Sequence, residues 1–303
     1  MRKWLWGVQI AVAGVVAVLV WRAIARNWDE FRSLHVALAL RPGWIALSTV
    51  AVFATYAVQI ESWRRILAGW DQHLSYTRAA RIWLLVNLGR YVPGKVWTVA
   101  GLIVLAQRAG VDAWAAGASA FAVQAVGLGT AVAMVAAATP AAESPLRLTA
   151  AASVAVATIA FLAWERGGRW LAGLAGRGEG FKPLPLTAVA ESGVLTLASW
   201  VTYGLAFWLL ARGLGLPSSL PLPTAAGVFA LGYILGLLAL FVPGGVGVRE
   251  IVFIGLLAPT LGSGGAVALS VASRVLLTLC EAVAPLGMLL ISGRTKEDLG
   301  VRT

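Results

Sequence analysis

Long apolar stretches follow one another along almost the whole chain, and they constrain the fold more than any other feature. Charged residues make up only 12% of the 303 residues and hydrophobic residues 59%, a composition typical of polytopic membrane proteins. The sequence therefore predicts an all-α polytopic membrane protein, a single membrane domain over 1–303 with no room for a soluble catalytic domain. Six stretches are long enough to cross a bilayer as full helical spans, at about 4–24, 43–62, 113–138, 147–164, 187–211 and 266–291.

The remaining charges lie mostly at the ends of the apolar stretches, and the formal net charge is +11. In a membrane protein such an excess of cations is explained by topology and by anionic lipid headgroups, so we expect no nucleic acid partner. The chain has one cysteine, Cys280, and two histidines, His35 and His73, which lie far apart in sequence. Because no metal-ligand or nucleotide-binding pattern is present, we expect no metal, no cofactor and no enzymatic activity.

The N-terminal apolar run, Trp4 to Trp21, follows two basic residues. A cleaved signal peptide has this arrangement, and the small residues Ala23 to Ala25 resemble a cleavage site. Because the run is long and Arg22 interrupts the approach to that site, an uncleaved first helix is the favoured interpretation.

Two further apolar regions, 82–107 and 224–258, are each interrupted by a Pro-Gly pair. The first reads Y-V-P-G-K-V around Pro93, and the second reads F-V-P-G-G-V around Pro243. Proline lacks an N–H and clashes with the preceding turn, so a helix ends there. Each arm of the first region spans only ~17 Å at ~1.5 Å per residue, about half of a ~30 Å hydrocarbon core. We therefore expect two re-entrant helical hairpins, and a single kinked span is the alternative for each region.

The distribution of cations favours the hairpins. If the N-terminus is cytoplasmic and both regions are re-entrant, most arginines and lysines fall in cytoplasmic loops, including the four in 165–182. A single crossing of each region would place that loop outside, against the positive-inside rule. Both termini are therefore predicted to be cytoplasmic.

The two halves of the chain share more than the Pro-Gly pairs. Three pairs of residues recur at separations of 147 to 150 residues, namely Pro93 with Pro243, Gln124 with Arg274, and Thr77 with Thr224. A single span between the halves would turn the second half over, which predicts an inverted-topology repeat. The predicted organisation is a first helix and loop in 1–42, repeat 1 in 43–138, a connecting span and linker in 139–186, repeat 2 in 187–291, and a tail in 292–303.

The helix breaks are the predicted functional site. A half-helix that starts after Pro-Gly presents free N–H groups and a positive dipole end to the membrane interior, where phosphate or carboxylate can bind. Ionisable groups gather there, which in a membrane indicates function, although structural ion pairs are the alternative. The predicted substrate-binding residues are Asn87, Arg90, Pro93, Gly94, Lys95, Pro243, Gly244, Gly245, Arg249, Glu250 and Arg274. Glu250 and Glu281 are the candidate proton carriers.

The stretch from Asn87 to Lys95, followed by the stretch from Val242 to Glu250, resembles the lysylphosphatidylglycerol synthetase transmembrane-region family of flippase-like membrane proteins. The family includes the membrane half of a protein that moves aminoacylated phosphatidylglycerol between leaflets. In that protein a soluble aminoacyl-transfer domain follows the membrane part. The present chain ends at Thr303, so we do not expect it to perform the synthase reaction. Other members resemble stand-alone proteins associated with glycosyltransferases.

The resemblance implies a lipid translocase in the bacterial inner membrane that binds a lipid with an anionic phosphate headgroup. A secondary transporter of a small anion, a membrane-embedded transferase and a non-catalytic partner of a glycosyltransferase or lipid-modifying enzyme are the alternatives. The sequence leaves open the lipid, the energy coupling and the oligomeric state.

Overall fold

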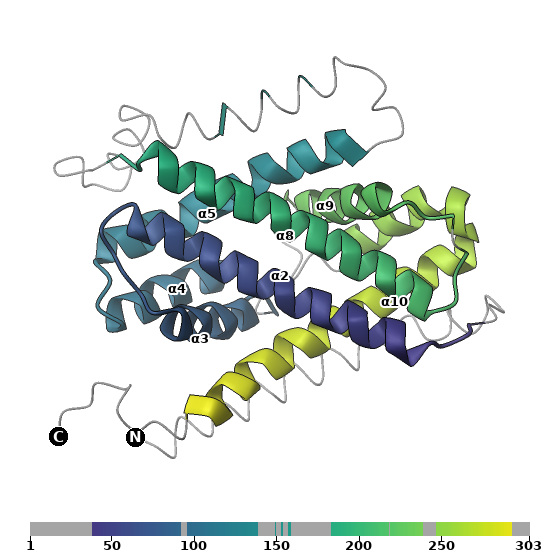
Figure 1. The fold of residues 1–303 in the computed structure, drawn as a ribbon, viewed down its shortest axis with the longest axis horizontal. Helices are drawn as coiled ribbons and strands as arrows, with labels where there is room; N and C mark the ends of the chain where they lie inside the picture. The colour runs from purple at the N-terminus through teal and green to yellow at the C-terminus, as the bar shows by residue number, and fades with distance from the viewer. Residues whose placement is uncertain are drawn as a thin grey trace.

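The computed structural model describes residues 38–91, 96–138, 149, 153, 157–158, 183–217, 219–238 and 247–292. All regular structure in these ranges is helical, and no strand occurs within them. The elements are α2 (Pro42–Ala68), α3 (Tyr76–Asn87), the 3-10 turn η1 (Leu88–Tyr91), α4 (Val96–Arg108), α5 (Ala113–Ala138), α8 (Leu186–Gly213), α9 (Leu222–Leu238) and α10 (Val248–Ser292), as Figure 1 shows.

Four of these helices, α2, α5, α8 and α10, are long and apolar enough to cross a membrane. They contain the predicted spans 43–62, 113–138, 187–211 and 266–291, which confirms that these stretches are long apolar helices. The predicted span 4–24, and all but four residues of 147–164, lie outside the described residues. The total of six spans therefore stays a prediction.

Helix α2 continues past the predicted end of its span at residue 62. The carboxylate of Glu61 forms ion pairs with Arg64 and Arg65, one turn further along the helix. Pairs at these spacings stabilise helical turns, so a polar last turn extends α2 to Ala68.

The first interrupted region contains two short helices, α3 and α4, on either side of the predicted break. Helix α3 begins at Tyr76, earlier than the apolar arm predicted from Ile82. The reason is a local cap, because the Ser75 hydroxyl accepts a hydrogen bond from the N–H of Arg78. An amphipathic turn thus precedes the apolar part of the arm.

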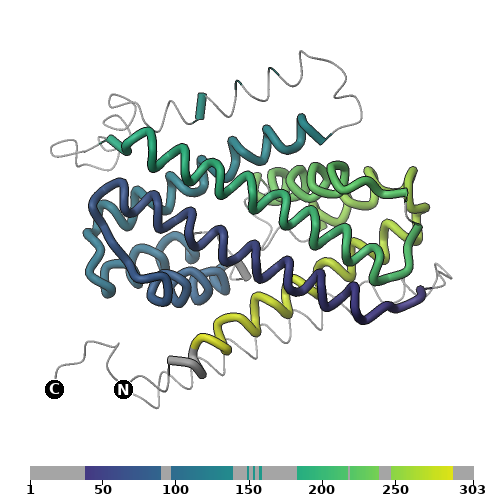
Figure 2. The backbone as a smooth tube through the Cα atoms, viewed as in Figure 1, coloured from purple at the N-terminus to yellow at the C-terminus, as the bar shows by residue number. Residues whose placement is uncertain are grey.

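Helix α10 consists of two helical segments joined by a bend. Gly262 has φ 72° and ψ 159°, a backbone conformation outside the helical region that L side chains rarely adopt. The bend separates 248–261 from 263–292, and Figure 2 follows the backbone through it. The second interrupted region therefore consists of α9 and the first part of α10, while the second part of α10 is the last predicted span.

Helices α2 and α8 pack against each other along most of their lengths and lie side by side in Figure 1. Their contact runs antiparallel, since Ser48 near the start of α2 donates to the carbonyl of Ala206 late in α8 at 2.7 Å. Towards the other end of α2, Ser62 Oγ lies 2.8 Å from Ser192 Oγ. Small hydroxyl side chains allow a close approach and bond across the interface, as is common between helices in membranes.

Two hydrogen bonds join the outer ends of the short helices. The backbone N–H of Asp112, just after α4, donates to Gln72 Oε1, just before α3, at 3.0 Å. At the opposite end of the bundle, Ser219 Oγ before α9 donates to the carbonyl of Thr260 near the bend of α10 at 3.2 Å. Each pair of short helices thus starts and ends at one side of the molecule, and Figure 1 shows α3 and α4 at one end and α9 at the other.

Candidate functional site

Part of the predicted site lies outside the described residues, namely Pro93, Gly94, Lys95, Pro243, Gly244 and Gly245. Asn87 is the last residue of α3 and is partly buried. Arg90 lies in η1, where the structure describes the backbone and not the side chain. The part of the site that the structure describes is therefore the charged cluster of the second half, made by Arg249, Glu250, Arg274 and Glu281.

Glu250 lies in the first turn of α10 and binds that turn back to its own start. Its Oε2 accepts a hydrogen bond of 2.6 Å from the backbone N–H of Gly247. Gly247 has φ 88°, and glycine reaches such a backbone conformation without strain. A glutamate that accepts the first N–H of its own helix satisfies a donor that has no partner within the helix.

The second carboxylate oxygen of Glu250 faces the later part of the same helix. Arg274 Nη1 lies 3.4 Å from Glu250 Oε1, and only 13% and 18% of these side chains is exposed. The structure thus joins Arg274 and Glu250 in an ion pair. The bend at Gly262 makes this pair possible, because it folds the second part of α10 back against the first.

Arg249 is surrounded by aromatic rings. Its Cζ lies 5.0 Å from the ring centroid of Phe229 on α9 and 5.4 Å from that of Phe253 on α10. Its Nε is buried and has no hydrogen-bond partner among the described residues. The charged or polar groups within electrostatic range of Arg249 are Arg274, Glu250, Glu281 and Tyr203.

Glu281 is buried, with 7% of its surface exposed, and lies further along α10. It directly follows Cys280, which is also buried. The structure thus places both candidate proton carriers in the low-dielectric interior, where a carboxylate needs a positive or hydrogen-bonding partner to stay charged.

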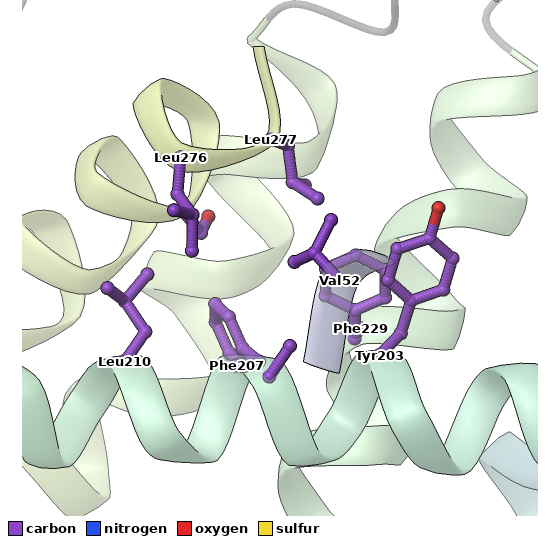
Figure 3. A pocket seen from close by; sticks show the side chains of 9 residues that line it. Val52, Tyr203, Phe207, Leu210, Phe229, Leu276 and Leu277 are labelled. Atoms are coloured by element: carbon purple, nitrogen blue, oxygen red, sulfur yellow. The ribbon is translucent and has the colours of Figure 1, made fainter. Parts of the chain in front are cut away.

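An aromatic cluster holds the rings that contact Arg249. Tyr203 on α8 stacks on Phe229 with ring centroids 4.7 Å apart, and Phe207 lies 4.9 Å from Phe253. The cluster borders a small, mostly apolar cavity between α2, α8, α9 and α10, seen in Figure 3. Its lining consists of Val52, Tyr203, Ala206, Phe207, Leu210, Phe229, Ser273, Leu276 and Leu277.

Gln124 and Arg274, which the sequence predicts to be counterparts, make different contacts. Gln124 Nε2 on α5 donates to Tyr233 Oη on α9 at 2.8 Å. Tyr233 packs edge-on against Trp200 of α8, with centroids 4.9 Å apart. Gln124 therefore makes a neutral polar contact, whereas Arg274 makes an ionic one.

Sequence reasoning missed the aromatic residues of the site. One signal for Phe253 was present, because Phe253 lies four residues after Arg249 and so occupies the same helix face. Phe229 and Tyr203 come from other helices, and nothing in the spacing of the sequence predicts that they meet Arg249. In the sequence Tyr233 is a single polar hydroxyl within an apolar helix, and this does not predict which residue it contacts.

The arrangement has the groups that can hold an anion. It combines two guanidinium groups with the N-terminal end of α10, all in partly buried surroundings. Within the described ranges, no three His, Cys, Asp or Glu side chains gather as metal ligands would.

A family model described as lysylphosphatidylglycerol synthase TM region matches residues 6–280 of the chain. The match includes both interrupted regions and, of the charged cluster, Arg249, Glu250 and Arg274. A search of curated proteins found no match to the chain.

Proposed function

The chain belongs to the lysylphosphatidylglycerol synthase transmembrane-region family, and on that basis we propose that it moves a lipid with an anionic phosphate headgroup between the leaflets of a membrane. The headgroup binds at the start of α10, beside Arg249 and Arg274, while the acyl chains stay in the surrounding lipid. We place the protein in the inner membrane of a bacterium, with both termini in the cytoplasm.

The observation that carries this proposal is the environment of Arg249. An ionisable side chain inside a membrane protein is costly unless it has a partner, so it indicates a functional site by default. The contacts of Arg249 with two aromatic faces leave the hydrogen-bonding edge of its guanidinium for another partner. A phosphate is a suitable partner, because a guanidinium binds it in a bidentate manner.

The proposal requires hairpins that enter the membrane and return. The bond between Gln72 and Asp112 supports this for α3 and α4, since their outer ends meet on one side of the bundle. The bond between Ser219 and Thr260 supports it for α9 and the first part of α10. A helix of 12 or 13 residues, such as α3 or α4, would cross only part of a ~30 Å hydrocarbon core.

The proposal also uses an inverted repeat, in which α2 corresponds to α8. Thr55 and Thr202 are 147 residues apart, as are Thr77 and Thr224, and Thr55 Oγ1 donates to Thr202 Oγ1 at 2.7 Å. Two equivalent residues in direct contact are what a local two-fold axis between α2 and α8 would produce. In this repeat α5 corresponds to the second part of α10, and α3 corresponds to α9. The contact of α5 with α9 then corresponds to the contact of α10 with α3. Alternating access would follow from rocking of one hairpin against the other.

The orientation follows from the charges at the two ends of the bundle. Arg64, Arg65 and Arg108 lie where α2 and α4 end, whereas Arg41 and Arg212 lie at the opposite end. The positive-inside rule assigns the first end to the cytoplasm. Hairpin α3–α4 would then enter from the cytoplasm, and hairpin α9–α10 from the outer side.

Leaflet exchange in liposomes tests the proposal. The purified protein is reconstituted, and the exchange of labelled phosphatidylglycerol, lysyl-phosphatidylglycerol and a polyprenyl-phosphate sugar is measured against protein-free vesicles. We expect exchange of at least one of these lipids and a loss of roughly tenfold or more in Arg249→Gln, comparable to removal of a charged hydrogen bond.

The matched control is Arg212→Gln. Arg212 also lies over an aromatic ring, 4.6 Å from the centroid of Trp208, but at the outer end of α8. We expect this variant to exchange lipid at the rate of the unmodified protein. No exchange of any lipid above protein-free vesicles would refute the proposed function, and uptake of a small soluble anion instead would favour a secondary transporter.

A further inference from the structure

The carboxylate of Glu250 occupies the position in which an anionic ligand of this site would be bound. It accepts the hydrogen bond of Gly247 N–H at 2.6 Å and pairs with Arg274 Nη1 at 3.4 Å. One of its oxygens therefore binds the helix end and the other binds a guanidinium. These are the two kinds of group that bind a phosphate at a helix N-terminus.

A cap formed by glutamate in the first turn is common at helix ends and alone would indicate nothing about a ligand. Here a second observation accompanies it. The adjacent residue, Arg249, has a buried Nε without a hydrogen-bond partner among the described residues, and its guanidinium contacts aromatic faces. The site thus holds an internal anion on one side and an unsatisfied buried cationic donor on the other.

The charge balance depends on Glu250. With Glu250 ionised, the Arg274 guanidinium has a carboxylate partner and an incoming phosphate meets a negative neighbour. With Glu250 turned away, the Gly247 N–H and the Arg274 guanidinium lose this carboxylate, and another anion can take its place. In partly buried surroundings this difference is large, because charges there are only weakly screened.

We propose that Glu250 is a resident competitor for the headgroup site, so that a lipid phosphate binds by displacing its carboxylate from Gly247 and Arg274. The inference rests on the proposed function, since it assigns the position of the headgroup and the step that admits it. Arg274 contacts Glu250 directly, and the adjacent Arg249 lies within electrostatic range of Arg274, Glu250, Glu281 and Tyr203.

Lipid binding by the purified full chain tests this step separately from transport. Retention of dioleoylphosphatidylglycerol is measured by native mass spectrometry at pH 7, with dioleoylphosphatidylcholine as the zwitterionic comparison. Glu250→Gln removes the competing charge while keeping the side-chain shape. We expect it to bind phosphatidylglycerol roughly tenfold more tightly, the effect of one charge-assisted contact, with phosphatidylcholine unchanged.

Two further variants make the result specific. Glu250→Asp keeps the competing charge and should keep the weak binding of the unmodified protein. Combining Glu250→Gln with Arg274→Gln removes the released cation and should abolish the gain. As a matched control, Glu191→Gln removes a carboxylate that pairs with Arg65 at 3.0 Å and is 51% exposed, and it should leave lipid binding unchanged.

Equal affinities of Glu250→Gln and the unmodified protein for phosphatidylglycerol would overturn the inference even if liposomes show exchange. Tighter binding in Glu250→Gln without exchange of any lipid would support the headgroup site and refute the translocase.

Discussion

The contact between α8 and α9 determines where the second hairpin lies relative to the long helices, and Gly204 makes that contact possible. A Cβ at Gly204 would lie 2.4 Å from Ala226 Cβ and 2.5 Å from Ala226 Cα. Carbon atoms in contact normally lie about 3.5–4.0 Å apart, so Gly204→Ala forces the two helices apart by about 1 Å. Such overpacking costs about 1–3 kcal/mol.

Alanine also favours the helical state over glycine, by about 1 kcal/mol. The comparison with Gly127→Ala isolates the packing cost. Gly127 is buried in α5, but outside its own helix backbone no atom of the described residues lies within 4 Å of a Cβ added there. Gly127→Ala should therefore be neutral or stabilising, and Gly204→Ala should be less stable than it by about 1–3 kcal/mol.

The assay is unfolding of the purified protein in mixed micelles with increasing sodium dodecyl sulfate, followed by tryptophan fluorescence. Gly204→Ala should unfold at a lower detergent fraction than the unmodified protein, and Gly127→Ala at an equal or higher one. If both variants unfold at the same fraction, the close approach of α8 and α9 does not constrain the fold, and the placement of the second hairpin derived from it is wrong.

Two other predictions concern α2. Trp63→Phe removes the hydrogen bond of 3.0 Å from Trp63 Nε1 to Ser119 Oγ, and we expect it to lower the stability in the same unfolding assay by about 1 kcal/mol; no change would mean that the bond is not formed. In a Cys280→Ser background, Thr55→Cys with Thr202→Cys should form a disulfide on mild oxidation, since the two hydroxyls are 2.7 Å apart. Lipid exchange should persist in the cross-linked protein, because the proposed motion moves the hairpins and keeps α2 and α8 together. Failure to cross-link would contradict the contact between Thr55 and Thr202. Loss of lipid exchange on cross-linking would contradict the idea that α2 and α8 stay together during transport.

The long helices could be predicted from the sequence because apolar length alone defines them. Their ends could not, because the ends depend on local polar contacts. Ion pairs from Glu61 extend α2 to Ala68, and the hydroxyl of Ser75 starts α3 before its apolar part. Hydropathy does not detect such contacts, so the predicted end of α2 and the predicted start of α3 fell at the edges of the apolar stretches.

The charged residues Arg249, Glu250 and Arg274 were singled out because ionisable residues in a membrane indicate function, and the structure joins Arg274 and Glu250 in an ion pair. Their role in binding stays a prediction. The pairing within the cluster could not be predicted. It depends on the bend at Gly262, which brings two parts of one helix together, and Gly262 is one of many glycines in this chain. The aromatic partners of Arg249 could not be predicted either, because Phe229 reaches it from another helix.

The contacts of Arg274 and Gln124 differ in a way that bears on the proposed mechanism. Arg274 pairs with Glu250 on its own helix, whereas Gln124, its predicted counterpart, bonds Tyr233 on α9. The Gln124 contact is neutral and ties α5 to α9, so it can hold the second hairpin in place without taking part in charge exchange. The Arg274 contact is ionic and can be replaced by another anion. If the two halves form the predicted repeat, its chemistry is asymmetric, and a headgroup that displaces Glu250 would break the ionic contact while the Gln124–Tyr233 bond stays formed.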